Sequence, residues 1–186
     1  MFGQNVNNVT AAKPKTGGAV WRAPIGTTLP TDASTALSTS FKSLGFISDA
    51  GLTHSFSPSA QQIRDWGGEV VYSYSQERPD TYQATFIEYM NTELLKTVYG
   101  DANVTVTGTT GQRTVTHNNN ELDEYVYVID EVLRGGALKR TVIPNGKVTA
   151  VGEEQNVHTG LIGYQLTITA MEDTAGNTSY DYILPA

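Results

Sequence analysis

The segment LIGYQLTITAM, Leu161–Met171, decides the fold. Alternate residues of this segment are apolar or aromatic, and Gln or Thr stands between them. One face of an extended chain would collect Ile162, Tyr164, Leu166, Ile168 and Ala170, and the other would collect Gln165, Thr167 and Thr169. A period of two is typical of a strand that buries one face and leaves the other in water. The segment therefore predicts an antiparallel sheet.

The composition of the whole chain agrees with this strand. Its 186 residues fit one domain of ordinary size. They include 25 Thr, 16 Val, 9 Ile and 10 Tyr, the branched and aromatic side chains that fit a pleated surface. The chain has no Cys, which excludes disulfide bonds, thiolate metal sites and a cysteine nucleophile.

Charge is distributed unevenly along the chain. Residues 1–31 hold three bases and no acid, whereas the whole chain has 12 bases and 19 acids, a net charge of −7. An acidic body repels phosphate, which disfavours a nucleic-acid-binding protein with a basic groove. The basic N-terminal segment either docks on an acidic surface, such as that of a neighbouring copy, or is a solvated tail.

The chain is predicted to divide into an arm and a body. Residues 1–18 are polar and predict an extended N-terminal arm that orders only against a partner. Residues 19–186 predict a single all-β domain with one α-helix, a β-sandwich or a barrel-like fold. Within it, residues 49–68 contain Gly51, Pro58 and a Gly pair, and they predict a long loop with a helical turn near its end.

Three further elements are predicted from local patterns. Glu69–Gln76 and Thr81–Glu88 are expected to pair as a hairpin around Pro79. A turn is expected at Pro144–Asn145–Gly146, between two later strands. Residues 91–99 predict the helix, because apolar side chains recur at helical spacing, Asn91 or Thr92 can cap its start and a Gly follows its end.

The sequence predicts no catalytic, cofactor-binding or metal site. His54, His117 and His158 stand in separate loops at no metal-ligand spacing, and no phosphate-binding or dinucleotide-binding motif is present. The carboxylates between Glu121 and Glu131 suggest either a Ca²⁺ site or a solvated acidic face, and the latter is favoured because the EF-hand spacing is missing. The same carboxylates are the only support for a small hydrolase.

Targeting signals are also missing from the sequence. There is no run of 18 apolar residues, so no segment is expected to span a membrane. The first residues, MFGQNVNNVTAAKPK, lack the apolar core of a signal peptide, so we expect synthesis and assembly in a cytoplasm.

Five stretches, taken in order, carry a resemblance to a known family. They are WRAPIGTTLPTD with the arm before it, Leu44–Leu52, Ile63–Val71, Phe86–Val104 and Leu138–Tyr182. With this ordered set, the chain resembles the major tail protein, or tail tube protein, of long-tailed, non-contractile bacteriophages. A non-catalytic β-sandwich that binds or adheres to partners on a virion or cell surface is the alternative, and it requires an exposed cluster of aromatic residues on one face.

The resemblance implies how such a chain works. Six copies form a ring whose sheets join edge to edge, and rings stack into a virion tail tube through which DNA passes without specific binding. The implied partners are further copies, a tape-measure protein and tail terminator and tip proteins, and assembly takes place in the host cytoplasm. Residues 49–68 would be the stacking loop, and the N-terminal arm would bridge successive rings.

Two sets of site residues follow from this reading. The residues expected at contacts between rings are Lys13, Lys15, Trp21, Arg64 and Trp66. The acidic residues expected to face the lumen are Glu69, Glu77 and Glu88, because carboxylates keep phosphates at a distance. No catalytic, cofactor or metal residue is assigned.

Overall fold

The computed structural model describes residues 5–156, 158 and 160–186, without the side chains of Asn7, Gln76 and Glu77. The fold is all-β with one α-helix in this described part, as predicted. The strands are β1 (Ala12–Pro14), β2 (Val20–Pro24), β3 (Lys42–Ser43), β4 (Ile47–Phe56), β5 (Ser59–Arg64), β6 (Val70–Glu77), β7 (Asp80–Phe86), β8 (Val104–Val106), β9 (Arg113–Val115), β10 (Tyr125–Leu133), β11 (Leu138–Val151), β12 (Tyr164–Met171) and β13 (Tyr180–Leu184). The helix α1 spans Thr92–Tyr99, and three short 3₁₀ turns span Val6–Asn8, Asp101–Asn103 and Arg134–Gly136. No described helix is long and apolar enough to cross a membrane.

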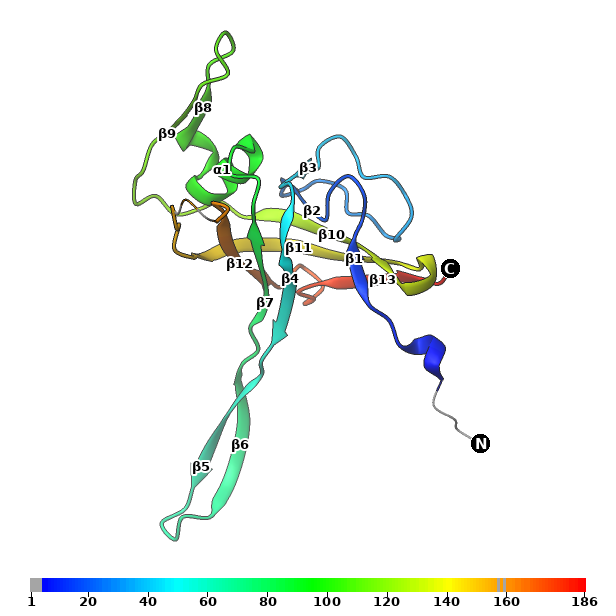
Figure 1. Cartoon of the computed structure of the whole chain (residues 1–186). Coiled ribbons are helices and arrows are strands. Elements are labelled where there is room, and N and C mark those ends of the chain that lie inside the picture. The colour runs from blue at the N-terminus through cyan, green and yellow to red at the C-terminus, as the bar shows by residue number, and fades with distance from the viewer. Residues whose placement is uncertain (1–4, 157, 159) are drawn as a thin grey trace.

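One nine-stranded antiparallel sheet forms the body (Figure 1). Its main path runs β3-β2-β10-β11-β12-β7-β4. β1 pairs with the end of β10 beyond β2, and β13 pairs with the first part of β11. In the described chain the two ends of the path, β3 and β4, do not pair, so the sheet curves without closing into a barrel.

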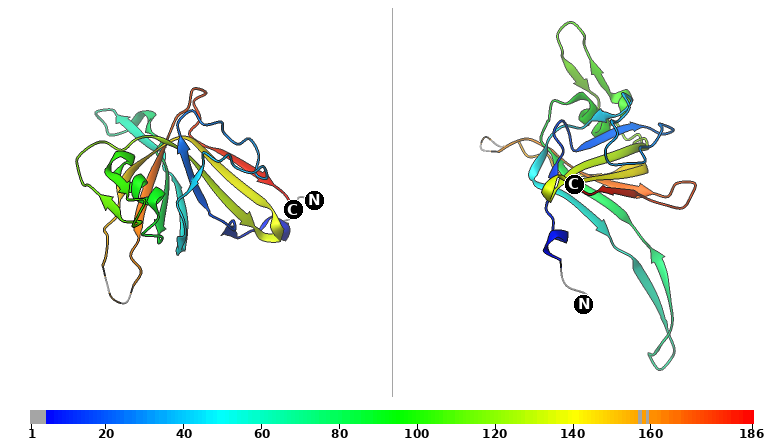
Figure 2. Two further views of the ribbon diagram at one scale, coloured as in Figure 1. Left: turned by 90° about the horizontal axis from the view of Figure 1, so that it is seen from above. Right: turned by 90° about the vertical axis from the view of Figure 1, so that its right-hand side faces the viewer.

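β11 joins the two halves of this sheet. Its residues 138–142 pair with β13, and its residues 145–151 pair with β12. Seen from above, the strands separate into two inclined groups that enclose an interior (Figure 2).

The turn predicted at Pro144–Asn145–Gly146 is wrong, because these residues lie inside the continuous strand β11. Pro144 stands where the partner strand changes, so its missing N–H removes no bond to β13 or β12, whose pairing stops and starts on either side of it.

The interior holds the larger of two apolar clusters. β12 contributes Tyr164, Leu166, Ile168 and Ala170, so the alternation predicted for this strand is confirmed. β7 contributes Phe86, and α1 covers one end with Leu94 and other apolar side chains. Burying such side chains contributes about 1.5–3 kcal/mol each, and this cluster is therefore the main source of stability.

A second cluster lies on the opposite face of β10. Val126 and Val128 pack there under the irregular segment 25–41, with Phe41 at its end. A buried ion pair fixes this cover, since the Arg140 guanidinium donates to both Asp130 carboxylate oxygens at 2.6 and 2.9 Å and to the carbonyls of Asp32 and Thr35. β10 is thus buried on both faces.

The helix follows the sequence prediction closely. The Asn91 side chain accepts hydrogen bonds from the backbone N–H groups of Glu93 and Leu94, and Gly100 ends the helix with φ at 94°. Arg22 of β2 is buried and donates to the carboxylates of Glu93 and Asp101 at 3.0 and 2.7 Å. These ion pairs hold the helix against the sheet.

The long loop predicted at Asp49–Gly68 is wrong. Most of this segment belongs to β4 and β5, which run antiparallel to β7 and β6 in one long hairpin (Figure 1). In its outer part, β5 and β6, cross-strand hydrogen bonds rather than burial hold the hairpin, so the sequence carries no clean apolar alternation there. The predicted pairing of Glu69–Gln76 with Thr81–Glu88 is also wrong, because Pro79 does not reverse the chain and β6 continues into β7.

The N-terminal arm is partly tied to its own body. β1 pairs with residues 131–133 of β10, and the backbone N–H of Lys15 donates to the Asp130 carbonyl. The expectation that residues 1–18 order only against a partner is therefore wrong for this part, because β10 extends beyond β2 and offers a free edge. Residues 1–4 lie outside the described part.

Candidate assembly surfaces

The outer part of the hairpin projects away from the body (Figures 1 and 2). Every residue of β5 and every described side chain from Val70 to Ser75 of β6 is exposed. Apolar residues occur on both faces, because Val71 is 62 % exposed and its neighbour Tyr72 is 59 % exposed. A lone two-stranded hairpin is marginally stable in water, and clustered exposed apolar side chains mark contact sites. The hairpin therefore has the properties of an interface element.

The hairpin tip is a well-ordered turn that presents one tryptophan. The Asp65 carboxylate accepts from the backbone N–H of Glu69 at 2.8 Å, and the Asp65 N–H donates to the Glu69 carbonyl at 2.9 Å. The Arg64 guanidinium donates to the Gly68 carbonyl at 2.9 Å. Trp66 lies at the centre of this turn, and its side chain is fully exposed.

A buried carboxylate anchors the base of the hairpin. Asp80 is 3 % exposed, and its Oδ1 lies 2.6 Å from His54 Nε2. Its Oδ2 accepts from the hydroxyls of Thr178 and Ser179 at 2.7 and 3.2 Å. The His54 ring stacks on Tyr82 with a centroid distance of 4.4 Å. The first residues of β7 are thereby tied both to β4 and to the turn before β13.

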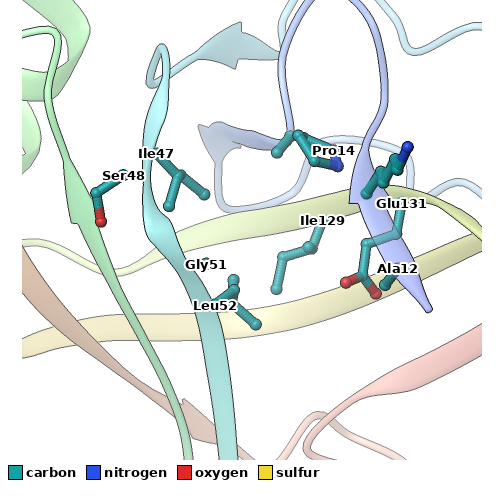
Figure 3. A pocket seen from close by; sticks show the side chains of 10 residues that line it. Ala12, Pro14, Ile47, Ser48, Gly51, Leu52, Ile129 and Glu131 are labelled. Carbon is teal, nitrogen blue, oxygen red and sulfur yellow. The ribbon is translucent and has the colours of Figure 1, made fainter.

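A seam runs between the edge strands β1 and β4 (Figure 3). Ile47 and Leu52 of β4 and Ile129 of β10 point into a cavity of about 100 Å³ there, with Ala12 and Pro14 of β1 on its other side. Between Ile47 and Leu52, β4 bulges away from its ladder with β7. In the described chain the outer edge of β4 has no partner strand, so its backbone can accept one.

A larger groove lies beside α1, at the end of the body opposite the hairpin. It has a volume of about 380 Å³ and is lined by aromatic rings, with Tyr164 stacked on Tyr89 at 5.1 Å and edge-on to Tyr99 at 5.9 Å. Burial raises the pKa of Tyr164 above its ordinary value, so its hydroxyl stays protonated. His117 and Arg113 complete the wall. An adjoining depression of about 550 Å³ shares Tyr89 and Arg113 with it.

Comparison with known proteins identifies the family of this chain. The family model described as phage tail tube protein matches residues 3–186. The chain belongs to the phage tail tube protein family. It is therefore a structural component of the phage tail, and family membership implies self-assembly into a tube.

Two other comparisons complete this result. No curated protein matches the tail tube protein. Among solved structures, the cryo-EM structure of the anti-feeding prophage cap, which terminates the tube, is similar with a TM-score of 0.44 and 9% sequence identity, and the match covers 91% of each chain.

The residues expected between rings lie in different places in this tail tube protein. Lys13 is exposed on β1, and the Lys15 ammonium group lies 3.7 Å from Asp130. Trp21 is half-buried on β2, and its indole N–H donates to the Gly18 carbonyl at 3.3 Å. Arg64 and Trp66 stand together at the hairpin tip. The structure therefore brings two of the five residues together on a projecting element.

The three predicted lumen carboxylates are spread along one arm of the hairpin. Glu69 lies at the tip, and Glu88 follows β7 at the far end, where its carboxylate accepts from the Phe46 N–H at 2.9 Å and the Asn91 side-chain amide at 3.1 Å. Glu88 thus fixes the connection before α1. Glu77 ends β6, and its side chain lies outside the described part. A lumen role for these residues stays a prediction.

Sequence reasoning missed the apolar hairpin residues and the aromatic groove of the tail tube protein. The sequence did contain a signal for the apolar hairpin residues, because Val70, Val71 and Tyr72 form an unbroken apolar run. A strand that buries one face and leaves the other in water needs only alternate apolar residues. The groove gave no signal, because α1, β9 and the start of β12 contribute to it from distant parts of the chain.

The acidic residues between Glu121 and Glu131 do not gather around a metal position. Glu121 and Glu131 lie 2.6 and 3.4 Å from the ammonium groups of Lys147 and Lys139. The Lys147 ammonium group also holds the pKa of Glu121 below its ordinary value. In the described part of the chain, no group of three or more His, Asp or Glu side chains could hold a metal ion.

Proposed function

We propose that this chain forms hexameric rings that stack into a tail tube, and that the tube is a non-catalytic conduit for DNA during genome ejection. Membership of the tail tube family supports the tube itself. The observation that carries the proposal is the projecting hairpin, whose apolar side chains are exposed on both faces. Its own chain gives these side chains no cover, so further copies must provide it.

Lateral contacts within a ring would use the open edges of the sheet. In the described chain, β4 and β13 each have one edge without a partner strand. Backbone groups at such edges readily pair with a strand of another molecule. If each copy pairs β4 with β13 of the next copy around a rotation axis, the ring closes and neither of these two edges remains unpaired.

Contacts between rings would use the hairpin and the arm. Both project from the same end of the body in two perpendicular views (Figures 1 and 2). The opposite end carries α1 and the small hairpin of β8 and β9. Elements that project from one end reach the next ring, and a head-to-tail contact of this kind continues without closing.

Passage of DNA is supported by the charge of the chain. A net charge of −7 lets phosphates slide past the protein without being held. We retain Glu69, Glu77 and Glu88 as candidates for the lumen wall, although the Glu88 carboxylate accepts hydrogen bonds from the Phe46 N–H and the Asn91 side-chain amide. The proposed partners are the tape-measure protein inside the tube and the terminator and tip proteins at its ends, and assembly takes place in the host cytoplasm.

Electron microscopy of the purified full chain tests this proposal. Six-fold rings and tubes are expected for the wild type, and Val71→Asp should abolish tubes because it places a charge in the buried hairpin contact. Val71→Thr is the matched control, because it keeps the branched shape and should still assemble. A wild-type chain that stays monomeric at high concentration contradicts the proposal, and rings of another copy number contradict the hexamer.

A further inference from the structure

We infer that the aromatic groove beside α1 receives Trp66 from the hairpin tip of a second copy. The inference rests on the proposed stacking of rings and names both sides of that contact. The donor is the turn Asp65–Glu69, and the receiving site is the groove of Tyr89, Tyr99 and Tyr164 with Arg113 at its rim.

The donor turn is already arranged for binding. Its backbone bonds between Asp65 and Glu69 and the bond from Arg64 to Gly68 hold the loop in one shape. An anchor presented on a rigid turn loses little conformational entropy when it binds. Trp66 is fully exposed, and tryptophan is among the residues that most often dominate the energy of an interface.

The groove fits an indole in size and in chemistry. Its volume of about 380 Å³ lies within the range of about 300–1,000 Å³ that is typical of pockets for ring-containing small molecules, whereas the seam cavity, at about 100 Å³, does not. The half-buried rings of Tyr89 and Tyr99 can stack on an aromatic partner, whereas Tyr164 is buried, and Met90 beside them is 67 % exposed. A buried indole N–H needs an acceptor, and the hydroxyl of the half-buried Tyr99, which is hydrogen-bonded to the Tyr164 hydroxyl at 3.3 Å, can provide one.

Charge at the two surfaces is complementary. The Arg113 guanidinium at the groove donates only to the Thr92 hydroxyl and the Gly111 carbonyl, and it pairs with no carboxylate among the described residues. The Glu69 carboxylate at the tip pairs with no described base. An Arg–carboxylate pair adds two directed hydrogen bonds to a contact. Glu69 would then face Arg113 of the next copy and not the lumen.

The positions of the two surfaces on the molecule decide how copies would be arranged. The tip between β5 and β6 and the helix α1, beside which the groove lies, are at opposite ends of the molecule (Figure 1). A contact between two different surfaces of identical molecules is heterologous, and it repeats from copy to copy as an open stack. This contact would therefore let further rings add to the end of the tube.

Cysteine cross-linking tests the contact directly, because the full chain contains no Cys. Gly67→Cys places a thiol beside Trp66 without removing it, since a Cβ there meets nothing closer than 3.4 Å. Combined with Met90→Cys, it should give a ladder of disulfide-linked oligomers on a non-reducing gel after mild oxidation. The matched control combines Gly67→Cys with Ile183→Cys, whose side chain is 62 % exposed on β13, and should give no ladder.

Charge reversal tests the pairing of Glu69 with Arg113. Glu69→Arg and Arg113→Glu should each raise the concentration needed for tube assembly by about tenfold, and the double variant should restore wild-type assembly. Trp66→Ala should raise it at least as much and leave the unfolding of the unassembled chain unchanged. If Glu69 lines the lumen, Arg113→Glu will not rescue Glu69→Arg, and the pairing is overturned.

The outcomes separate this inference from the proposed function. Tubes without a Gly67–Met90 ladder overturn the groove contact and leave the tube intact. A ladder with the Ile183 variant in its place moves the receiving surface to β13 and also overturns it. A wild type without tubes and without a ladder overturns both.

Discussion

β6 and β7 follow each other along the chain and form one side of the long hairpin, yet β7 is buried and β6 is exposed. In β7, Tyr82, Ala84 and Phe86 are buried at 4 %, 6 % and 1 % exposure. In β6, Val71 and Tyr72 are more than half exposed. Both strands are rich in side chains that favour sheets, so composition alone does not tell them apart. The difference shows that two strands of similar composition can differ completely in burial, because neighbouring elements of the same chain cover β7 and leave β6 uncovered.

The largest expected effect separates the two strands by stability. Phe86→Ala should lower the free energy of unfolding by about 3–5 kcal/mol, because it leaves a cavity in the interior cluster. Tyr72→Ala should lower it by less than about 0.5 kcal/mol, because its ring is exposed in the unassembled chain. Urea unfolding of unassembled protein measures both. Equal losses would mean that the hairpin is packed against its own body.

A smaller effect is expected where the two strands meet. Asp80→Ala removes the acceptor of Thr178 and Ser179 and the partner of His54, and we expect a loss of about 1–3 kcal/mol in the free energy of unfolding. His54→Phe keeps the ring stacked on Tyr82 and should cost less. If Asp80→Ala leaves urea unfolding unchanged, the carboxylate does not hold the hairpin to the body.

The smallest effect is a dependence of stability on alkaline pH that comes from Tyr82 of β7. Burial raises the pKa of Tyr82 to about 12, above an unfolded value of about 10. Because the folded pKa is the higher one, this contribution to stability is complete below about pH 10 and is lost as the pH rises toward about 12.

Thermal unfolding between these pH values measures the effect. Tyr82→Phe should flatten the alkaline decline, although other buried tyrosines keep part of it, since burial also raises the pKa of Tyr125, Tyr127 and Tyr164. A decline in the Tyr82→Phe variant as steep as that of the wild type would mean that this tyrosine does not contribute to it.

Local chemistry determined several elements of this chain directly. The alternation in Leu161–Met171 predicts β12, and the cap at Asn91 with Gly100 predicts α1, because each depends on residues close in sequence. Composition alone shows that the chain has no Cys and carries more acidic than basic residues. These signals establish an all-β body with one helix, and the ordered resemblance of five stretches indicates its family.

Only the tertiary structure decided where the remaining strands pair and what they leave exposed. The backbone groups of β5 and β6 hydrogen-bond to each other, and neither strand has a buried face. Their sequence therefore shows no clean alternation of apolar and polar residues. β11 passes through Pro144 without turning because its partner strand changes there. The groove beside α1 and the tip with Trp66 likewise depend on contacts between distant segments. Hydrogen-bond partners and packing neighbours are set by the path of the whole chain, and no local pattern specifies that path.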